Sequence, residues 1–569
     1  MKPLPLHRRW GCSAALLALL SMPAPAECID QSPGDAHQQF EFQLPEDKLT
    51  PHIPDEAYIN RIEVRRFNIF DLDNPRDNRW YGRLANRLHW VTREREVRHL
   101  LLFKEGDPWE PQRIAESERL LRRESYLYDA RVRPLRLCGN AVDLLVLVRD
   151  VWTISGGASF SRSGGENKSE LFISDSNLLG TGTTLSLGRD KDAERSGSFF
   201  EFSDRTLQGS RWQLNTRYAD NDDGFDYLLA LQKPFFSLDS RSSIGFEVRQ
   251  TDQDTSLYYH DDKFETFQQD TDSASLSLGW SRGLHKGRAR RWELGWQYTE
   301  DRFSPAADTR DPLALPQDRT RAFPWLGYSS VEDEFRVARN INDLQRSEDI
   351  YVGERWGLRL GLAGTAVGSD ESQIYASAYY HNTARDTEQQ LLFVELEGEG
   401  FWDQSDNDWE NLVISHRWRW FLNPYRRSQW LLEARLDYTR NLTRDNQLLL
   451  GGSTGLRGYP SRFQTGDRAF LFSLEKRYHY DIHLWRLFYI GSAAFFDIGR
   501  AWFPDRNDYP DVEGRGDDDG VLTNIGIGLR ITSSRFRSDQ VLHIDLAFPL
   551  ERGENIDDVQ LVLRGRQRF

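Results

Sequence analysis

A glycine-rich stretch late in the chain carries an arginine in a setting suited to a specific charge pair. Residues 451–470 read GGSTGLRGYPSRFQTGDRAF, with Arg457 directly before Gly458, between two strand-like segments. Glycine permits left-handed backbone angles and lets neighbouring backbone segments of the protein approach closely. The stretch therefore predicts a loop that folds back on the protein. On such a loop Arg457 could reach a buried carboxylate and form a two-pronged hydrogen bond with it. The alternative is a surface connector in which Arg457 faces water.

Other residues of catalytic type form no motif. The 12 histidines are scattered, and His479 and His483 lie four apart around a turn rather than on a helix, which argues against a zinc pair. No set of serine, histidine and aspartate is apparent, so we predict no enzyme and no catalytic, metal or cofactor-binding residue. Acidic clusters at residues 220–223, 261–262 and 517–519 are interpreted as solvated loop tips, with calcium sites as the alternative.

The elements that would position the glycine-rich loop are strands of a membrane barrel. The chain has 569 residues, 12% aromatic residues and a mean hydropathy of −0.66, which suits a barrel in which only alternate residues face lipid. Beyond Val151 the chain alternates with period two, as in residues 292–298, 356–362 and 430–438, and alternation gives roughly eighteen to twenty strand candidates. After the N-terminus no apolar run has the length of a transmembrane helix. The net charge of −15 argues against a nucleic-acid partner.

The N-terminal quarter is interpreted as a leader followed by a small α/β domain. Residues 1–26 have the basic, apolar and small-residue regions of a signal peptide, and residues 27–56 form a polar, flexible lead-in. Residues 57–150 show strand and helix periodicity in the order β-α-α-β-β. Export would place Cys28 and Cys138 in an oxidising compartment, where they could form a disulfide or stay free. A lipid-bearing Cys28 is a further alternative.

Six short segments, taken in chain order, carry a resemblance to a known family. They are residues 116–122 (ESERLLR), 148–154 (VRDVWTI), 175–182 (DSNLLGTG), 456–459 (LRGY), 495–502 (FFDIGRAW) and 543–550 (HIDLAFPL). Together they resemble the BamA/TamA family of outer-membrane assembly factors and its secretion-transporter relatives. BamA-like members carry several POTRA domains, whereas this chain has room for one.

The resemblance implies a mostly β fold and a lock inside it. The fold would be a transmembrane antiparallel β-barrel of about sixteen strands over residues 151–569, preceded by one small α/β POTRA domain over residues 57–150. The aspartate of the segment FFDIGRAW would accept the arginine of LRGY inside the barrel. The residues expected in this lock are Arg457, Gly458, Tyr459 and Asp497.

A second expected feature is the seam at which the first and last strands meet. The residues expected there are Gly156, Gly157, Arg564, Arg566 and Phe569. Glycine weakens strand pairing, and neighbouring arginines on the lumen side repel each other, so the seam could open sideways and offer an unpaired edge to an incoming strand. The alternative is an ordinary closing seam in which glycine relieves crowding.

The expected function is outer-membrane protein assembly or translocation. The protein would lie in the bacterial outer membrane with its N-terminal domain in the periplasm, and would insert or export client polypeptides through or beside its barrel. Its expected partners are the lipid bilayer, unfolded client polypeptides bound through the POTRA domain, and other envelope assembly proteins. The alternatives are a gated pore and a secretion transporter for one dedicated partner protein, and the N-terminal domain could instead serve as a plug or spacer.

Overall fold

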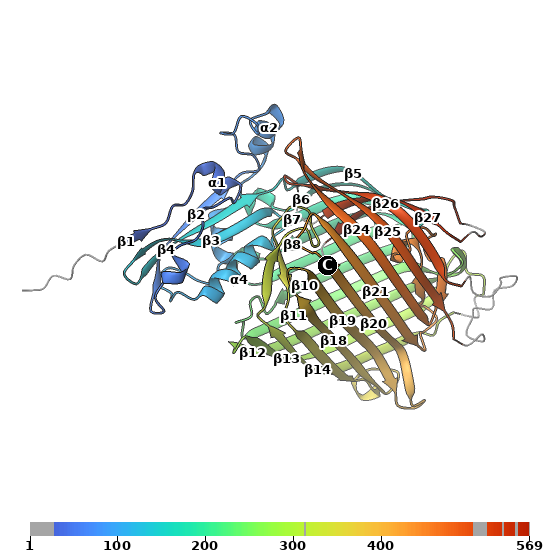
Figure 1. Ribbon diagram of the computed structural model, residues 1–569. Coiled ribbons are helices and arrows are strands. Elements are labelled where there is room, and N and C mark those ends of the chain that lie inside the picture. Colours follow the sequence, from blue (N-terminus) through green and yellow to red (C-terminus); the bar gives the residue numbers. More distant parts are fainter. Residues whose placement is uncertain are drawn as a thin grey trace, which may run out of the picture.

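The chain forms two parts, an N-terminal domain and a barrel (Figure 1). The computed structural model describes residues 28–311, 315–504, 520–536, 540–551, 553 and 556–567, without the side chains of 157–160, 540, 566 and 567. The expected signal peptide, residues 1–26, and Phe569 therefore lie outside the described residues. No helix in the described ranges is long and apolar enough to cross a membrane.

The N-terminal domain is a four-stranded sheet with helices packed against it. Its elements are β1 (Cys28–Asp30), α1 (Ala36–Phe40), β2 (Tyr58–Phe67), α2 (Trp80–Leu88), α3 (Glu94–Leu100), α4 (Pro111–Arg122), β3 (Leu127–Cys138) and β4 (Ala141–Asp150). The strands lie in the order β1-β3-β4-β2, with β2 parallel to β4 and the other pairs antiparallel. Val97, Leu100 and Leu121 of α3 and α4 share one buried core with Ile62 and Val146 of the sheet.

The domain contains more elements than the predicted β-α-α-β-β order. Helix α2 stands between β2 and α3, where the sequence predicts no helix, and α1 and β1 lie within the predicted lead-in. The nine residues of α2 include Gly82 and Asn86, which are poor helix formers. The large apolar side chains of the helix, Trp80, Leu84 and Leu88, are exposed rather than packed in the core of the domain. A disulfide joins Cys28 to Cys138 where β1 pairs with β3, so the start of the lead-in is fixed to the sheet.

Twenty antiparallel strands close into the barrel. They are β5 (Ile154–Ser163), β6 (Glu166–Asp175), β7 (Thr183–Lys191), β8 (Ser196–Asp204), β9 (Gln213–Asn221), β10 (Gly224–Lys233), β11 (Ser242–Tyr259), β12 (Asp262–His285), β13 (Arg288–Pro305), β14 (Arg319–Glu332), β17 (Arg355–Leu362), β18 (Gln373–Asp386), β19 (Gln390–Asp403), β20 (Asp408–Leu422), β21 (Ser428–Arg440), β24 (Arg468–Leu484), β25 (Phe488–Trp502), β26 (Leu522–Ser533), β27 (Gln540–Pro549) and β28 (Gln560–Gln567). The fold class is confirmed as mostly β with a closed antiparallel barrel, but the strand number implied by the resemblance, about sixteen, is wrong. The first six strands have only nine or ten residues each. Because these strands are short, the same length of chain holds more strands.

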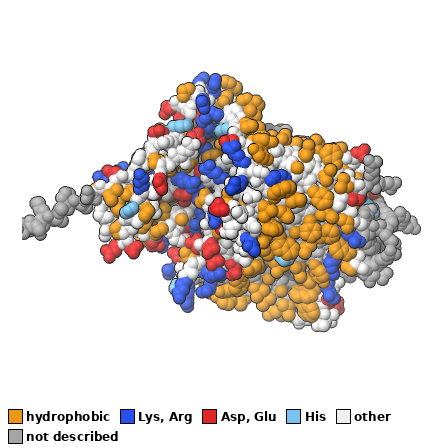
Figure 2. Space-filling model, viewed as in Figure 1, with side chains coloured by type: hydrophobic (Ala, Val, Ile, Leu, Met, Phe, Trp, Pro, Cys, Tyr) orange, Lys and Arg blue, Asp and Glu red, His pale blue; other side chains and the backbone are white. Residues whose placement is uncertain are grey.

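The outer surface of the barrel is apolar, as the alternating pattern predicts. Trp292, Leu294 and Trp296 on β13 are 42%, 49% and 39% exposed, and Figure 2 shows the apolar belt to which such residues belong. Charged residues of the same wall, such as Asp497 and Glu475, are buried inside. An exterior of this kind fits the hydrocarbon region of a bilayer.

The N-terminal domain covers one end of the barrel, here called the near end, while the opposite end is the far end (Figure 1). The domain contacts several near-end turns through hydrogen bonds. Asn177 Nδ2 donates to Thr92 Oγ1 at 2.8 Å, and the backbone N–H of Leu238 donates to Glu116 Oε1 at 2.7 Å. These contacts hold α3 and α4 across the near mouth.

Two connections between strands leave the wall and enter the lumen. The inner loop, residues 441–467, joins β21 to β24 at the far end and contains β22 (Leu448–Leu450) and β23 (Gln464–Gly466). The connector, residues 333–354, joins β14 to β17 at the near end and contains β15 (Phe335–Ala338) and β16 (Glu348–Tyr351). The barrel is therefore filled from both ends.

Candidate functional site

The inner loop is a compact insert with an apolar core of its own. Its Leu450, Leu456 and Tyr459 are fully buried and share a cluster with Ala469 and Leu522 of the wall. The strands β22 and β23 pair antiparallel and close the base of the loop. The loop therefore folds back into the barrel.

Arg457 at the tip of this loop forms a bidentate pair with Asp497 of β25. Arg457 Nε donates to Asp497 Oδ2 at 2.8 Å, and Nη2 donates to Oδ1 at 2.7 Å. Asp497 has no exposed surface, and the guanidinium carbon of Arg457 lies 3.4 Å from the ring centre of Phe495. Ser473 and Asn524 each donate a further hydrogen bond to the carboxylate, at 2.7 and 2.9 Å. The pair is thus surrounded by groups that satisfy both charges.

The pair belongs to a larger charge cluster of three arginines and three carboxylates. Its members are Arg457, Arg477, Arg530, Glu475, Asp497 and Asp545. Glu475 accepts from Arg457 at 2.9 Å and from Arg477 at 2.8 Å, and Arg530 lies 2.5 Å from Asp545. Attraction between the three positive and three negative side chains offsets the desolvation free energy of burying them. Loss of one member would leave a buried charge without a partner of opposite sign.

Gly458 and Tyr459 extend the lock from β25 to β26. The backbone N–H of Gly458 donates to Asn524 Oδ1 at 3.1 Å, and a Cβ at position 458 would lie 2.6 Å from the Asn524 Cβ. Only glycine therefore fits there without a shift of β26. Tyr459 donates its hydroxyl to the Thr523 carbonyl at 2.7 Å and also contacts Glu551. All four residues of the predicted lock thus lie in one contact network.

The seam between β5 and β28 is the weakest strand pairing of the barrel. Among the described residues it consists of one registered pair, Leu563 with Arg162, whereas every other barrel ladder has at least seven. Gly156 and Gly157 pair instead with β6, and Arg566 pairs with β27. Most of the edge of β5 therefore lacks a backbone partner within the described chain.

Backbone and side-chain groups of the inner loop bridge this seam. On the β5 side, the Ser461 N–H donates to the Gly164 carbonyl at 2.9 Å, and its hydroxyl donates to the Ser163 carbonyl at 3.0 Å. On the β28 side, Arg564 donates both to Ser163 Oγ and to the carbonyl of Gly452 in the loop. The inner loop thus connects β5 and β28, which share only one registered pair among the described residues.

The tip of the β11–β12 hairpin covers the same loop from the far end. The Gln447 side chain exchanges hydrogen bonds with the backbone of Tyr258 at 2.8 and 3.0 Å, and the ring of His260 stacks on that of Phe463. Burial and the nearby Glu166 carboxylate raise the pKa of Asp261, in the turn, to about 6. A charge at Asp261 therefore opposes packing of the tip.

The connector is an element inside the barrel that the sequence analysis did not predict. Arg122 of α4 forms two hydrogen bonds to the Asp349 carboxylate, at 2.6 and 2.8 Å, and Arg346 donates to the Leu127 carbonyl at 2.5 Å. In the lumen, Arg477 Nη1 donates to the Ile341 carbonyl at 3.3 Å. The connector thus links the N-terminal domain to the charge cluster. The available signal was its length, because the other near-end turns are short.

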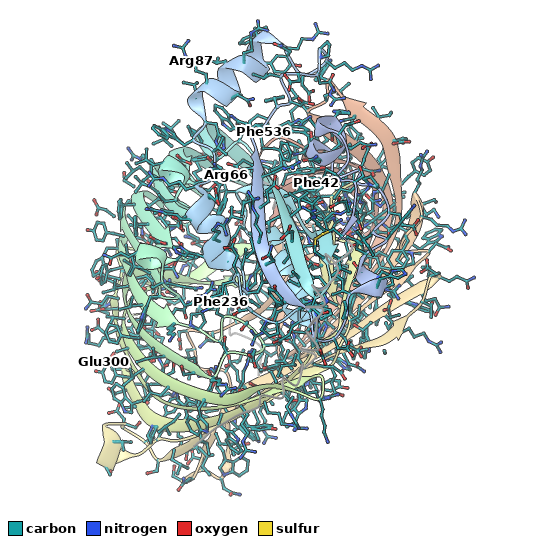
Figure 3. All side chains as sticks on the ribbon, turned by 90° about the vertical axis from the view of Figure 1, so that its left-hand side faces the viewer. Phe42, Arg66, Arg87, Phe236, Glu300 and Phe536 are labelled. Atoms are coloured by element: carbon teal, nitrogen blue, oxygen red, sulfur yellow. A yellow bond between two sulfur atoms is a disulfide. The ribbon has the colours of Figure 1, made fainter. Side chains whose placement is uncertain are left out.

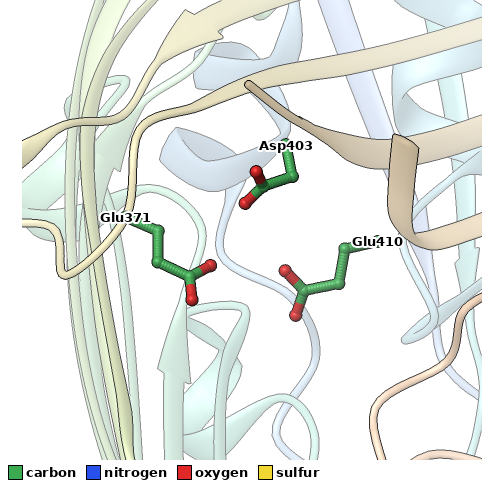
Figure 4. Close-up of side chains that lie close together, drawn as sticks. All are labelled: Glu371, Asp403 and Glu410. Atoms are coloured by element: carbon green, nitrogen blue, oxygen red, sulfur yellow. The ribbon is translucent and has the colours of Figure 1, made fainter. Parts of the chain in front are cut away.

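Three acidic side chains meet near the far end, but they are already partnered. Glu371, Asp403 and Glu410 bring their carboxylates together (Figure 4). The amide of Gln373 donates to all three, and Arg321 pairs with Glu410 at 2.6 Å. We therefore assign no metal ion to this group.

Comparison with known proteins finds distant structural likeness alone. No family model matches the chain, and no curated protein matches it. Among solved structures, BamA from Haemophilus ducreyi lacking POTRA domains 1–3 is 14% identical, with 90% of this chain and 84% of that chain covered and a TM-score of 0.40. CdiB from Acinetobacter baumannii is 13% identical (90% and 73% covered, TM-score 0.42), and CdiB from Escherichia coli is 12% identical (90% and 76%, TM-score 0.43). At TM-scores below 0.5 these likenesses carry no argument about function.

Proposed function

We propose that this chain is an outer-membrane barrel that inserts or exports polypeptides through its β5–β28 seam, with the N-terminal domain in the periplasm. The apolar belt supports the membrane location, and the seam carries the proposal. A strand edge with a single registered partner can accept an incoming strand by β-augmentation, because its free N–H and C=O groups still require hydrogen bonds. The inner loop would keep the seam closed until a client arrives.

The N-terminal domain would contact clients before the seam does, in the manner of a POTRA domain. Part of its edge strand β2 is already occupied: Ile59 exchanges backbone hydrogen bonds with residues 106 and 107, and the Ile62 N–H and carbonyl bond to Glu105 and Arg98. Client contact by strand addition would thus fall on the later part of β2 or on the short edge strand β1.

Site-specific crosslinking in native outer membranes tests this proposal. A photoreactive residue replaces Ser161 on β5, Leu561 on β28 or the half-exposed Ile29 on β1, and the matched control replaces Leu294 on the lipid-facing side of β13. We expect discrete protein adducts at the seam positions and at Ile29, and none at Leu294. A folded barrel without adducts at Ser161 and Leu561 would contradict the proposal.

A gated pore is the second candidate, and one cavity favours it. A space of about 500 Å³ lies in the lumen, lined by Phe323, Trp325, Tyr375 and Phe401 among others. A pore predicts steady ion conductance in planar bilayers that rises when Arg457 is replaced, together with no client adducts. An assembly or secretion barrel predicts adducts whether or not the unmodified protein conducts.

A further inference from the structure

We infer that helix α2 is a membrane-interface anchor that inserts its apolar side chains into the periplasmic surface of an anionic bilayer. The inference rests on the proposed membrane location of the barrel. It concerns a helix that projects beside the barrel rim and to which neither the inner loop nor the seam assigns a role.

The outward face of α2 is apolar and largely exposed, and the ring of Trp80 meets that of Tyr81 of the same helix. Trp80, Leu84 and Leu88 recur at intervals of four residues and so form one stripe, and Trp90 follows just after the helix. Their exposed fractions are 70%, 47%, 52% and 59%. Four neighbouring large apolar side chains with this much exposure are the mark of an interaction surface rather than of scattered surface residues.

Basic residues flank this stripe. Residues 78–90 contain Arg79, Arg83 and Arg87 and no aspartate or glutamate. Arg83 and Arg87 recur at the same four-residue interval and lie next to the apolar stripe around the helix, and Figure 3 shows Arg87 on α2 at the rim of the molecule. A short helix with large apolar residues on one side and arginines beside them matches the chemistry of a membrane surface that carries anionic headgroups.

The opposite face of α2 fixes the helix to its domain. Asn86 Oδ1 accepts from the Phe70 N–H at 3.0 Å, and Asn86 Nδ2 donates to the Phe70 carbonyl at 2.8 Å. The rings of Tyr81 and Phe70 meet edge to face, and Gly82 is buried beside Asp77. Helix α2 is therefore already packed on its domain through its inner face, and the exposed stripe is not needed for that packing.

Ion pairs tie the base of α2 to the near-end turns of the barrel. The Asp77 carboxylate is 1% exposed and accepts from Arg486 of the β24–β25 turn at 2.5 Å and from Arg535, after β26, at 3.3 Å. Arg535 also donates to the Ile69 carbonyl at 3.0 Å. The position of α2 relative to the barrel is thus determined by buried contacts.

This position continues the apolar surface of the barrel. The turns that hold α2 expose Trp485 and Phe536, at 70% and 45%, and Figures 1 and 2 show α2 with its apolar side chains beside the rim of the belt. Aromatic residues at the rim of a membrane barrel lie at the level of the lipid headgroups. A bilayer that surrounds the belt would meet the stripe of α2 at its periplasmic surface, whereas a soluble protein partner would need to enter the headgroup layer to reach it.

The depth of a spin label measures this contact directly. The full-length protein, with a nitroxide on Leu84→Cys, is reconstituted in vesicles of three parts POPE to one part POPG and, separately, of POPC alone. A label on Asn78→Cys, exposed at the foot of the helix, marks water, and a label on Leu294→Cys marks the lipid-facing wall of the barrel. We expect the label at 84 to be more accessible to oxygen than to a water-soluble nickel complex, with about a tenfold difference in this ratio from position 78.

The outcomes separate this inference from the proposed function. A lipid-immersed label at 294 with a water-exposed label at 84 would overturn the anchor alone and would point to a protein partner for the stripe. A water-exposed label at 294 would overturn the membrane barrel itself. The double variant Arg83→Glu/Arg87→Glu should raise the water accessibility of the label at 84 in POPG vesicles and leave it unchanged in POPC. The single charge reversal Arg61→Glu, on the exposed side of β2, should change neither. An effect of this reversal half as large as that of the double variant would contradict a role for the flanking arginines.

Discussion

The inner loop and the connector enter the same lumen from opposite ends, yet their charged contacts are arranged differently. The inner loop relies on side-chain charges: Arg457 lies in a cluster with the carboxylates of three wall strands, β24, β25 and β27. The connector instead forms separate ion pairs along its length, such as Asp349 with Arg122 at 2.6 Å and Asp333 with Arg119 at 3.1 Å. Backbone carbonyls add further hydrogen bonds, which Arg346, Arg477 and Gln429 donate. The charges of the inner loop therefore meet in one buried cluster, whereas those of the connector are spread over several separate pairs.

The two inserts also contact different regions of the protein. The inner loop bonds to both sides of the seam, whereas the connector bonds to the N-terminal domain through Arg122 and Asp349. Arg477 links the connector to the charge cluster that holds the inner loop, because it donates to Glu475 of the cluster and to the Ile341 carbonyl of the connector. A client on the N-terminal domain could thus affect the seam through the connector and this arginine, through the chain that runs from β4 into β5, or by direct contact.

The largest expected effect comes from Arg457→Met, which removes the charge at the centre of the inner loop. Asp497 and Glu475 would be left buried without their shared partner, so we expect the barrel to lose about 3–5 kcal/mol of stability. The measurement is the temperature at which the folded band disappears in semi-native gel electrophoresis. The control is Arg359→Met, a lumen arginine that stacks on Trp325 and has no carboxylate partner in the described chain. Similar losses in both variants would contradict a special role for the lock.

The next largest effect tests the connector. Asp349→Asn weakens the bidentate contact with Arg122, and loss of a buried charge-assisted hydrogen bond costs about 1–3 kcal/mol. We expect faster amide hydrogen exchange over residues 333–354 and unchanged exchange over residues 448–466. The control is Glu94→Gln in the exposed pair with Arg98, which should alter neither segment. Equal acceleration of the two segments would show that the inserts behave as one unit.

The same contrast explains how much of the molecule the sequence could predict. Alternating apolar residues predicted the barrel because lipid outside and lumen inside impose a period of two on every strand, such as residues 292–298. The glycines beside Arg457 are a local pattern that predicted a loop folded back on the protein, and the resemblance of residues 495–502 then supplied Asp497 as the partner. The connector has no such pattern: Glu348 holds its turn by accepting the N–H groups of Ile341 and Asp343, a role that any buried glutamate could fill. Helix α2 was missed although Trp80, Leu84 and Leu88 form an apolar stripe along it. The helix has only nine residues and contains Gly82 and Asn86, which are poor helix formers.

A smaller effect is expected at the seam. Arg564→Ala removes the side chain that joins β28 to Ser163 and to the inner loop, and loss of these neutral-acceptor bonds should cost about 1 kcal/mol. The readout is disulfide formation by the pair Arg162→Cys/Leu563→Cys, which should become slower by a few-fold because the strands separate more often. The cysteine pair Leu278→Cys/Leu294→Cys, registered between β12 and β13, should be unaffected. An unchanged rate at the seam would mean that the single backbone pair suffices to close it.

The smallest effect is a pH dependence confined to the inner loop. Because burial and Glu166 raise the pKa of Asp261 to about 6 from its usual 3.8, the folded state binds this proton more tightly than the unfolded state does. The resulting stabilisation is fully present below pH 3.8 and is lost as the pH rises through about 6. After correction for intrinsic exchange, protection of residues 448–466 should therefore be a few-fold greater at pH 5 than at pH 7.5, while residues 333–354 should not respond. Asp261→Asn should abolish the difference between the two pH values. A pH dependence that persists in this variant would have to arise from another group near the tip, such as Glu166, and the β11–β12 turn would then not be the element that distinguishes the two inserts.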